Sequence, residues 1–195
     1  MNIIALYVRA RARLLRRKVG PADIVLIGGS SVEFWRTSAG DMLPLRSRNF
    51  GIGGSTAAQW VDFIHNLVLP CQPKTVFIFA GSNDIHMRGK SAETAFDHLR
   101  ALFEALHMHL PEAKIYYAGI YLTNQYSAHW QADRECNRLV REYAQHGNVQ
   151  YIDIPAALAD EKGVPLKDIF RRDGEHLNDL GYALWREAIV PQLRG

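Results

Sequence analysis

Ser30 follows an apolar run that ends abruptly in glycine. Residues 24–27 are Ile-Val-Leu-Ile, and they are followed by Gly28, Gly29, Ser30 and Ser31. A short apolar run bounded by glycine is typical of a buried strand in a parallel sheet, and open α/β sheets bind their ligands at the carboxyl ends of such strands. Ser30 is therefore a candidate nucleophile, and the glycines allow the backbone to turn sharply beneath it.

Three other parts of the chain could supply what a nucleophilic serine needs. A serine hydroxyl is weakly nucleophilic until a base removes its proton, and the base in turn needs a carboxylate that orients it. His176 and Asp173 can fill these two roles from one short loop. The oxyanion of a tetrahedral intermediate needs hydrogen-bond donors. The backbone N–H groups of Ser30 and Gly54 and the side-chain amide of Asn83 can provide three, so the set is suited to acyl transfer.

Strand-like apolar runs alternate with longer amphipathic segments along the chain. The expected strands are 24–28, 46–50, 75–80, 114–120 and 149–153, and the expected helices are 56–69, 91–109, 130–146 and 178–193. Strands separated by helices predict right-handed βαβ units, and hence a parallel sheet with helices on both faces. This arrangement would deliver the serine and its partners to one edge of the sheet.

Other residues could carry the same chemistry or line the same site. Ser31 adjoins Ser30 and is a second candidate nucleophile, or a residue of a first helical turn. Asp62 and His65 repeat the Asp-x-x-His spacing, but they fall inside an expected helix, away from the carboxyl edge, so we expect them to be a surface or packing feature. His86 either lines the cleft or faces solvent. Asp84 is expected to fix the loop of Asn83 through hydrogen bonds.

Neither a metal nor a disulfide framework is expected. Cys71 and Cys136 are far apart in sequence and are interpreted as free thiols. His107 and His109 face different sides of a helix, and no cluster of His, Cys, Asp and Glu has metal-ligand spacing. The polar stretch 121–131, with its scattered aromatic residues, is a candidate substrate-recognition loop, and Trp130 is the residue we single out in it.

The net charge of +3 is concentrated at the start of the chain. Residues 1–18 contain six basic residues and no acidic one, so the other residues carry a net charge of −3. A domain that binds nucleic acid is basic itself, whereas here the residues after 18 have a net negative charge, so we expect no nucleic-acid partner. The 195 residues suffice for one domain with a core of its own, which we place at 21–195.

The basic segment also has an apolar period that predicts an amphipathic helix over residues 1–20. The apolar stripe consists of Ile3, Leu6, Tyr7, Ala10 and Leu14. We expect this stripe to pack on the domain with the arginines in water; the alternative is a helix that contacts a membrane surface or a partner. The apolar residues precede the arginines, which is the reverse of a secretory signal, and no apolar run approaches the roughly 20 residues of a membrane span. These observations favour a cytoplasmic protein.

Taken together, four blocks of this sequence resemble the SGNH hydrolases, also called GDSL-type esterases and lipases. The blocks are 28–31, 49–56, 81–84 and 173–178, and the resemblance runs from about residue 23 to the carboxyl end. It implies a three-layer α/β/α, flavodoxin-like fold with five parallel strands in the order 2-1-3-4-5. It also implies Ser30 as nucleophile, His176 as base, Asp173 as its orienter, and Gly54 and Asn83 as oxyanion donors beside Ser30.

The resemblance has two departures and one functional alternative. Gly29 stands where the family usually has aspartate, and Ser55 stands where it often has aspartate. Neither position belongs to the catalytic groups. We therefore expect a carboxylic ester hydrolase that needs no metal or cofactor and acts on short-chain or small soluble esters, with thioesters or lysophospholipids as side substrates. The alternative is a catalytically degenerate protein that binds an acyl or carbohydrate ligand in the same cleft.

Overall fold

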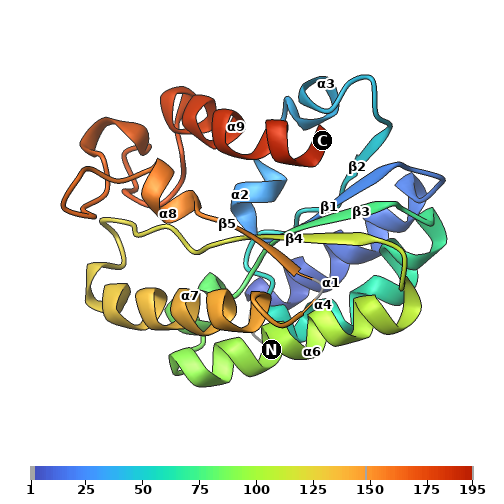
Figure 1. Cartoon of the computed structure of the whole chain (residues 1–195), viewed down its shortest axis with the longest axis horizontal. Helices are drawn as coiled ribbons and strands as arrows, with labels where there is room; N and C mark the ends of the chain where they lie inside the picture. Colours follow the sequence, from blue (N-terminus) through green and yellow to red (C-terminus); the bar gives the residue numbers. More distant parts are fainter. Residues whose placement is uncertain (1–2, 148, 195) are drawn as a thin grey trace.

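Five parallel strands form one sheet in the order β2-β1-β3-β4-β5 (Figure 1). The computed structural model describes residues 3–147 and 149–194. The strands are β1 (Ile24–Gly28), β2 (Ser47–Asn49), β3 (Thr75–Phe79), β4 (Lys114–Ala118) and β5 (Val149–Ile152). This order confirms the flavodoxin-like arrangement that the sequence implied, with β1 and the serine near the middle of the sheet.

Helices cover both faces of the sheet and make three layers (Figure 1). One face is packed by α1 (Ile3–Leu15), α4 (Ala57–Leu67), α6 (Ala92–His109) and α7 (Trp130–Ala144). The other face is packed by α2 (Ser30–Glu33), α3 (Ser38–Asp41), α8 (Ile154–Ala157) and α9 (Asp179–Arg194). Short helical segments complete the chain: α5 (Ser82–His86), η1 (Arg16–Lys18), η2 (Leu69–Cys71), η3 (Ser127–His129) and η4 (Lys167–Ile169).

The apolar run of β1 is continuous because both of its faces are covered. Val25 and Ile27 pack with the helices of one layer, whereas Leu26 packs with those of the other. Successive side chains of a strand point to opposite faces, so a central parallel strand needs apolar residues at every position. All five residues of β1 are buried, which confirms this part of the sequence analysis.

The longer elements lie where the sequence predicted them, but the short helices were missed. Elements α2, α3, α5 and α8 contain four or five residues each. A segment of about one helical turn shows no 3.6-residue period, so hydrophobic patterning cannot reveal it. The consequence for the site is local: Ser30 and Asn83 both sit in the first turn of a short helix rather than in an open loop.

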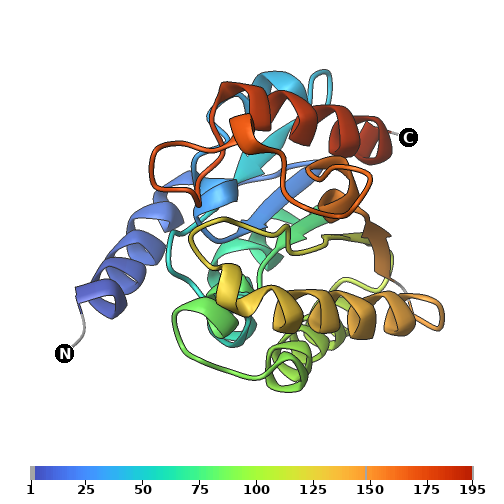
Figure 2. The ribbon, with the colours of Figure 1, turned by 90° about the vertical axis from the view of Figure 1, so that its left-hand side faces the viewer.

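The face of α1 that packs on the sheet layer is not the one we expected. Val8, Ala12 and Leu15 are buried in the core, whereas the stripe that contains Ile3, Tyr7 and Leu14 is exposed. The expectation was wrong because α1 carries two apolar stripes, and Val8, Ala12 and Leu15 also recur at helical spacing. Figure 2 shows α1 at the side of the molecule, with its amino end directed away from the sheet.

The cysteines and the helices of the described residues complete the picture of the fold. Cys71 and Cys136 are free and buried, as interpreted from the sequence. Within residues 3–147 and 149–194, no helix has the length and apolarity required to cross a membrane.

Candidate active site

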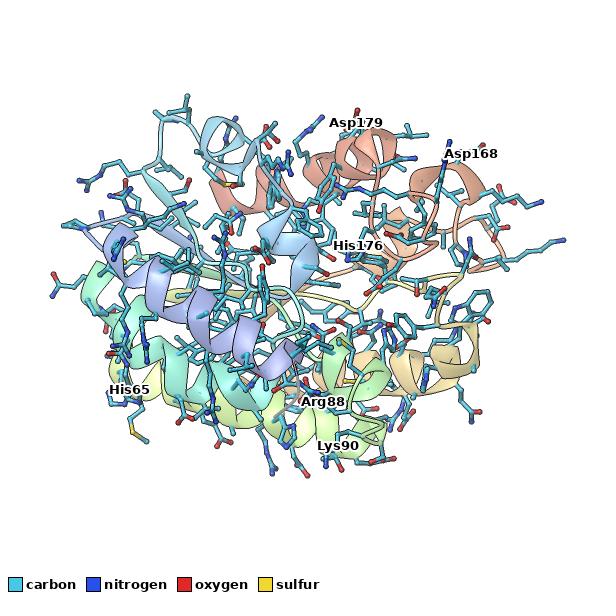
Figure 3. The ribbon with its side chains drawn as sticks, turned by 180° about the vertical axis from the view of Figure 1, so that it is seen from behind. His65, Arg88, Lys90, Asp168, His176 and Asp179 are labelled. Atoms are coloured by element: carbon cyan, nitrogen blue, oxygen red, sulfur yellow. The ribbon has the colours of Figure 1, made fainter. Side chains whose placement is uncertain are left out.

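Ser30, His176 and Asp173 form a continuous chain of contacts at the carboxyl edge of the sheet. Ser30 begins α2 directly after β1, and its Oγ lies 3.0 Å from Nε2 of His176. The other ring nitrogen of His176, Nδ1, lies 2.9 Å from Oδ2 of Asp173. The histidine is labelled in Figure 3, in the loop that precedes α9. This is the arrangement in which an imidazole can take a proton from a serine while a carboxylate fixes its orientation.

The Asp173 carboxylate is held in its ionised form by its own loop. Its Oδ1 accepts hydrogen bonds from the backbone N–H groups of Glu175 and His176, both at 2.9 Å. Burial alone would raise the pKa of Asp173, but these two hydrogen bonds and the neighbouring His176 ring outweigh it and lower the pKa to about 2. The loop therefore presents a carboxylate to Nδ1 at neutral pH.

The turn beneath Ser30 depends on one of its two glycines. Gly28 has a φ of +146°, and a Cβ there would lie only 1.9 Å from the carbonyl oxygen of Phe79. Gly29 has an ordinary φ of −81° and donates its N–H to that same carbonyl. A Cβ at position 29 would lie 3.0 Å from Nδ2 of Asn83. The residue that replaces the family's aspartate therefore borders the amide of Asn83.

Asn83 and Gly54 lie beside Ser30, with N–H groups available to a ligand. Asn83 is buried, and one N–H of its amide donates to the carbonyl of Ser55 at 2.9 Å, which fixes the amide group. Gly54 has a φ of +74°, a conformation that favours glycine. In the described part of the chain, no group accepts a hydrogen bond from the backbone N–H of Ser30 or Gly54. Ser30, Gly54 and Asn83 line the same pocket.

That pocket has a volume of about 450 Å³ and apolar walls. Its apolar and aromatic residues include Ile3, Ile4, Tyr7, Phe34, Met87 and Tyr126, so α1 forms one side of it. The Phe34 ring packs edge-on against His176, with 5.2 Å between ring centroids. An apolar pocket with a few converging polar groups is typical of a small-molecule site.

Comparison with known proteins decides the family. The family model described as "GDSL-like Lipase/Acylhydrolase family" matches residues 11–184. The chain belongs to this family. The family is one of hydrolases that act on esters, which agrees with the resemblance that the four sequence blocks carry. No relative was found among curated protein sequences.

Solved structures of GDSL-type proteins share the fold at low sequence identity. A Streptococcus pneumonia protein named for platelet activating factor is 20% identical, with a TM-score of 0.85 and coverage of 97% of this chain and 94% of its own. A GDSL-like lipase from Bacteroides thetaiotaomicron is 17% identical, with a TM-score of 0.70 and coverage of 98% and 97%. A mutant of Axe2, an acetyl-xylooligosaccharide esterase from a Geobacillus species, is 19% identical, with a TM-score of 0.72 and coverage of 90% and 96%. These structures show that the fold is that of the GDSL family.

The competing candidates, Ser31, Asp62, His65 and Trp130, are not among the residues that line the Ser30 pocket of this GDSL-type chain. Ser31 is buried, and its Oγ lies 2.8 Å from the hydroxyl of Tyr121 rather than beside His176. Asp62 and His65 are exposed on α4, as expected, and Figure 3 shows His65 far from His176. Trp130, which we expected to contact substrate, donates its indole N–H to the carbonyl of Thr123 at 2.8 Å and does not line the Ser30 pocket.

Asp84 joins three helices around Asn83, which confirms the expectation that it fixes this segment. Its Oδ2 accepts the backbone N–H of Ala57 at 2.8 Å, at the start of α4. Its Oδ1 lies 2.7 Å from Nδ1 of His98 on α6. The carboxylate is buried, so these contacts hold α5 and its Asn83 against both neighbours.

Of the two alternatives for His86, the structure favours the cleft: His86 lines a small pocket together with Ser30 and Asn83, and its side chain is only 4% exposed. Its Nε2 lies 2.9 Å and 3.0 Å from the two oxygens of Asp133, and both side chains are buried. Burial raises the pKa of Asp133, although His86 opposes that effect. The imidazole also stacks on Tyr126 at a centroid distance of 4.3 Å. The pair supports the wall of the pocket formed by Tyr126, and no sequence pattern linked residues 86 and 133.

Glu33 is the residue that the sequence analysis missed. Its Oε2 accepts the backbone N–H of Gly53 at 2.6 Å, directly before Gly54. Its Oε1 accepts the hydroxyl of Tyr7 at 2.6 Å and lies 3.0 Å from Nε of Arg11. Burial and the bond to Glu33 raise the pKa of Tyr7 to about 12, so its hydroxyl remains a donor. One carboxylate, only 9% exposed, thus ties α1 to the loop that carries Gly54.

Proposed function

We propose that this GDSL-family protein hydrolyses short-chain or small soluble carboxylic esters through an acyl-enzyme on Ser30. The observation that carries the proposal is the contact between Ser30 Oγ and His176 Nε2, at 3.0 Å, with Asp173 behind the imidazole. Membership of an ester-hydrolase family agrees with it. Thioesters and lysophospholipids are proposed as side substrates because both expose an acyl carbonyl to the same nucleophile.

In the first half-reaction, Ser30 Oγ attacks the ester carbonyl carbon while His176 Nε2 takes the hydroxyl proton. Asp173 accepts a hydrogen bond from Nδ1–H of His176 and stabilises the imidazolium that forms. The tetrahedral oxyanion receives hydrogen bonds from the backbone N–H groups of Ser30 and Gly54 and from the amide of Asn83. Its collapse breaks the bond to the alcohol oxygen, which takes the proton from His176 and leaves.

In the second half-reaction, water replaces the alcohol. His176 removes a proton from the water as its oxygen attacks the acyl carbon on Ser30. The second tetrahedral intermediate uses the same donors, and its collapse returns the proton to Ser30 Oγ and releases the carboxylic acid. These steps involve no change of oxidation state, and they use only groups of the chain, the ester and water.

The size and chemistry of the pocket favour small esters. At about 450 Å³, it is comparable to the smaller ligand sites of proteins, and its walls include the apolar side chains of Phe34, Met87 and Tyr126. A short acyl chain can be buried against these residues with its carbonyl carbon at Ser30. Ser30, Asn83 and His176 line the same pocket and supply polar groups that can orient the ester.

Hydrolysis of p-nitrophenyl esters from acetyl to decanoyl tests the proposal. The wild type should hydrolyse the shorter esters, and Ser30→Ala should reduce the rate to the uncatalysed background. Ser31→Ala is the matched control, because it removes a hydroxyl one residue away and should retain most of the activity. A Ser30→Ala variant as active as the wild type would refute Ser30 as nucleophile. A wild type inert on all esters, an acyl thioester and a lysophospholipid would favour the binding-only alternative.

A further inference from the structure

A stripe of apolar side chains runs along the solvent-facing side of α1. Ile3 is 81% exposed, Leu6 43%, Tyr7 45% and Leu14 52%. At 3.6 residues per turn these side chains fall within about 100° of the helix circumference, together with the exposed Ala10. We call this set the outer stripe of α1. It is distinct from the buried stripe that attaches α1 to the core, so its exposure is not explained by packing within the chain.

A row of basic side chains borders the outer stripe. Arg9 and Arg13 are exposed on α1 beside it, and Arg16, Arg17 and Lys18 follow in η1. Within the described ranges, no acidic side chain forms an ion pair with any of these five residues. Apolar residues beside unpaired cations are the pattern of a helix that lies in the interface of an anionic membrane.

The outer stripe is continuous with the Ser30 pocket. Ile3 and Tyr7 belong to the stripe and also line the pocket, and Ile4 contributes to the same wall. The attachment of α1 is well defined, because Tyr7 and Arg11 are both held by Glu33. Figure 3 looks onto α1, with His176 near the centre of the same face. A flat surface that covers the stripe would therefore also adjoin the pocket.

We propose that the outer stripe of α1 and the row of basic side chains beside it bind the surface of an anionic phospholipid membrane. The apolar side chains would enter the boundary between headgroups and acyl chains, and the cations would contact lipid phosphates. A second copy of this chain fits less well, because an antiparallel two-fold contact along the stripe would bring the two rows of basic side chains together. The binding goes beyond the proposed function and does not require an active Ser30. Membrane binding would also bring esters at the lipid surface close to the pocket, and this consequence rests on the proposed function.

Vesicle sedimentation tests the proposal with two kinds of α1 variant. The wild type should sediment with equimolar phosphatidylcholine–phosphatidylglycerol vesicles, bind phosphatidylcholine alone weakly, and be released by added salt. Arg9→Gln with Arg13→Gln should weaken binding about 30-fold, as two surface cations lose their attraction to anionic lipid. Leu6→Ser with Leu14→Ser should weaken it by about tenfold or more, because two apolar side chains no longer enter the interface. None of these four residues lines the Ser30 pocket.

The controls remove similar groups elsewhere. Leu180→Ser changes a leucine of α9 that is 52% exposed, the same fraction as Leu14. Arg100→Gln with Arg138→Gln removes two exposed charges from α6 and α7. These variants should bind as the wild type does, apart from a small common effect of net charge. Thermal melting of every variant shows whether it is folded.

The outcomes separate this proposal from the proposed esterase. Ser30→Ala should bind vesicles like the wild type, and a wild type that binds vesicles but hydrolyses no ester would refute only the esterase. The membrane proposal is overturned if the wild type does not sediment with anionic vesicles, or if the α1 and control variants lose binding equally. It is also overturned if the wild type is a dimer that the outer-stripe variants dissociate, because the occupant would then be a second copy.

Discussion

Replacing Glu33 with glutamine should weaken both the attachment of α1 and the loop that carries Gly54. One carboxylate oxygen accepts a hydrogen bond from the N–H of Gly53. The other accepts a hydrogen bond from the Tyr7 hydroxyl and forms an ion pair with Arg11. Glutamine has nearly the same shape but only one acceptor oxygen. Whichever way its amide turns, the NH₂ group faces a donor, and Arg11 loses its counter-charge.

The magnitude follows from these contacts. A hydrogen bond to a charged group contributes about 1.5–3 kcal/mol, and Glu33 is buried enough for most of that to apply. Allowing for the partial exposure of Arg11, we expect the free energy of unfolding to fall by about 2–3 kcal/mol, or a Tm lower by about 5–10 °C. Removal of a complete oxyanion donor costs about 10²–10³ in kcat. A displaced Gly54 N–H should therefore cost about tenfold in kcat, with a smaller change in KM.

Thermal melting and p-nitrophenyl acetate kinetics on the same preparations give both quantities. Arg11→Gln is the matched control, because it breaks the ion pair on the α1 side and leaves the bond from Gly53 to Glu33 in place. It should lower the Tm and preserve kcat. If Glu33→Gln had wild-type kcat, the proposed link from Glu33 to the oxyanion donors would be wrong. Equal losses of kcat in both variants would mean that the effect passes through α1 instead.

Three further predictions concern individual side chains. Asn83→Ala should lower kcat for p-nitrophenyl acetate by about 10²–10³ with little change in KM, and a near-normal rate would refute its role as an oxyanion donor. Because the pKa of Asp173 is about 2 in the folded protein and about 3.9 in an unfolded chain, its carboxylate stabilises the fold above about pH 4. That contribution is lost as the pH falls through about 2. The Tm difference between wild type and Asp173→Asn should therefore narrow toward pH 2. We expect this Tm difference to be modest, since the Asp173 side chain is 47% exposed. A Tm difference that widens toward pH 2 would contradict the stabilising role of the Asp173 carboxylate. Tyr126→Ala should raise KM for the longer esters more than Trp130→Ala does, because only Tyr126 lines the pocket; equal chain-length profiles for the two variants would argue against this wall as the acyl site.

The strands could be predicted because burial on both faces gives them a local sequence pattern. The contact between Ser30 and His176 could be predicted because the sequence blocks resemble those of a known family. The apolar run of β1 reflects burial on both faces, which leaves a direct mark on the sequence. The approach of residues 30 and 176 has no local mark, and it was anticipated only through the resemblance of the four blocks. The division into a helix at 1–20 and a domain at 21–195 stays a prediction.

The parts that could not be predicted depend on contacts between distant segments. Both apolar stripes of α1 have helical period, so periodicity cannot say which one meets the core. Val8 and Ala12 are buried because the rest of the domain meets that side. No pattern in the sequence marks Glu33, and its importance emerges only when Tyr7 and Gly53 converge on it. Patterns along a chain describe exposure to water better than they describe pairing between side chains.

Labelling with a fluorophosphonate probe tests most directly whether Ser30 is an activated nucleophile, because the probe requires an activated serine. Mass spectrometry of the intact protein and of its peptides would count the adducts and locate them. We expect one adduct, on Ser30, that is absent in Ser30→Ala and strongly reduced in His176→Ala. An unlabelled wild type, an adduct on Ser31, or full labelling of Ser30→Ala would contradict it.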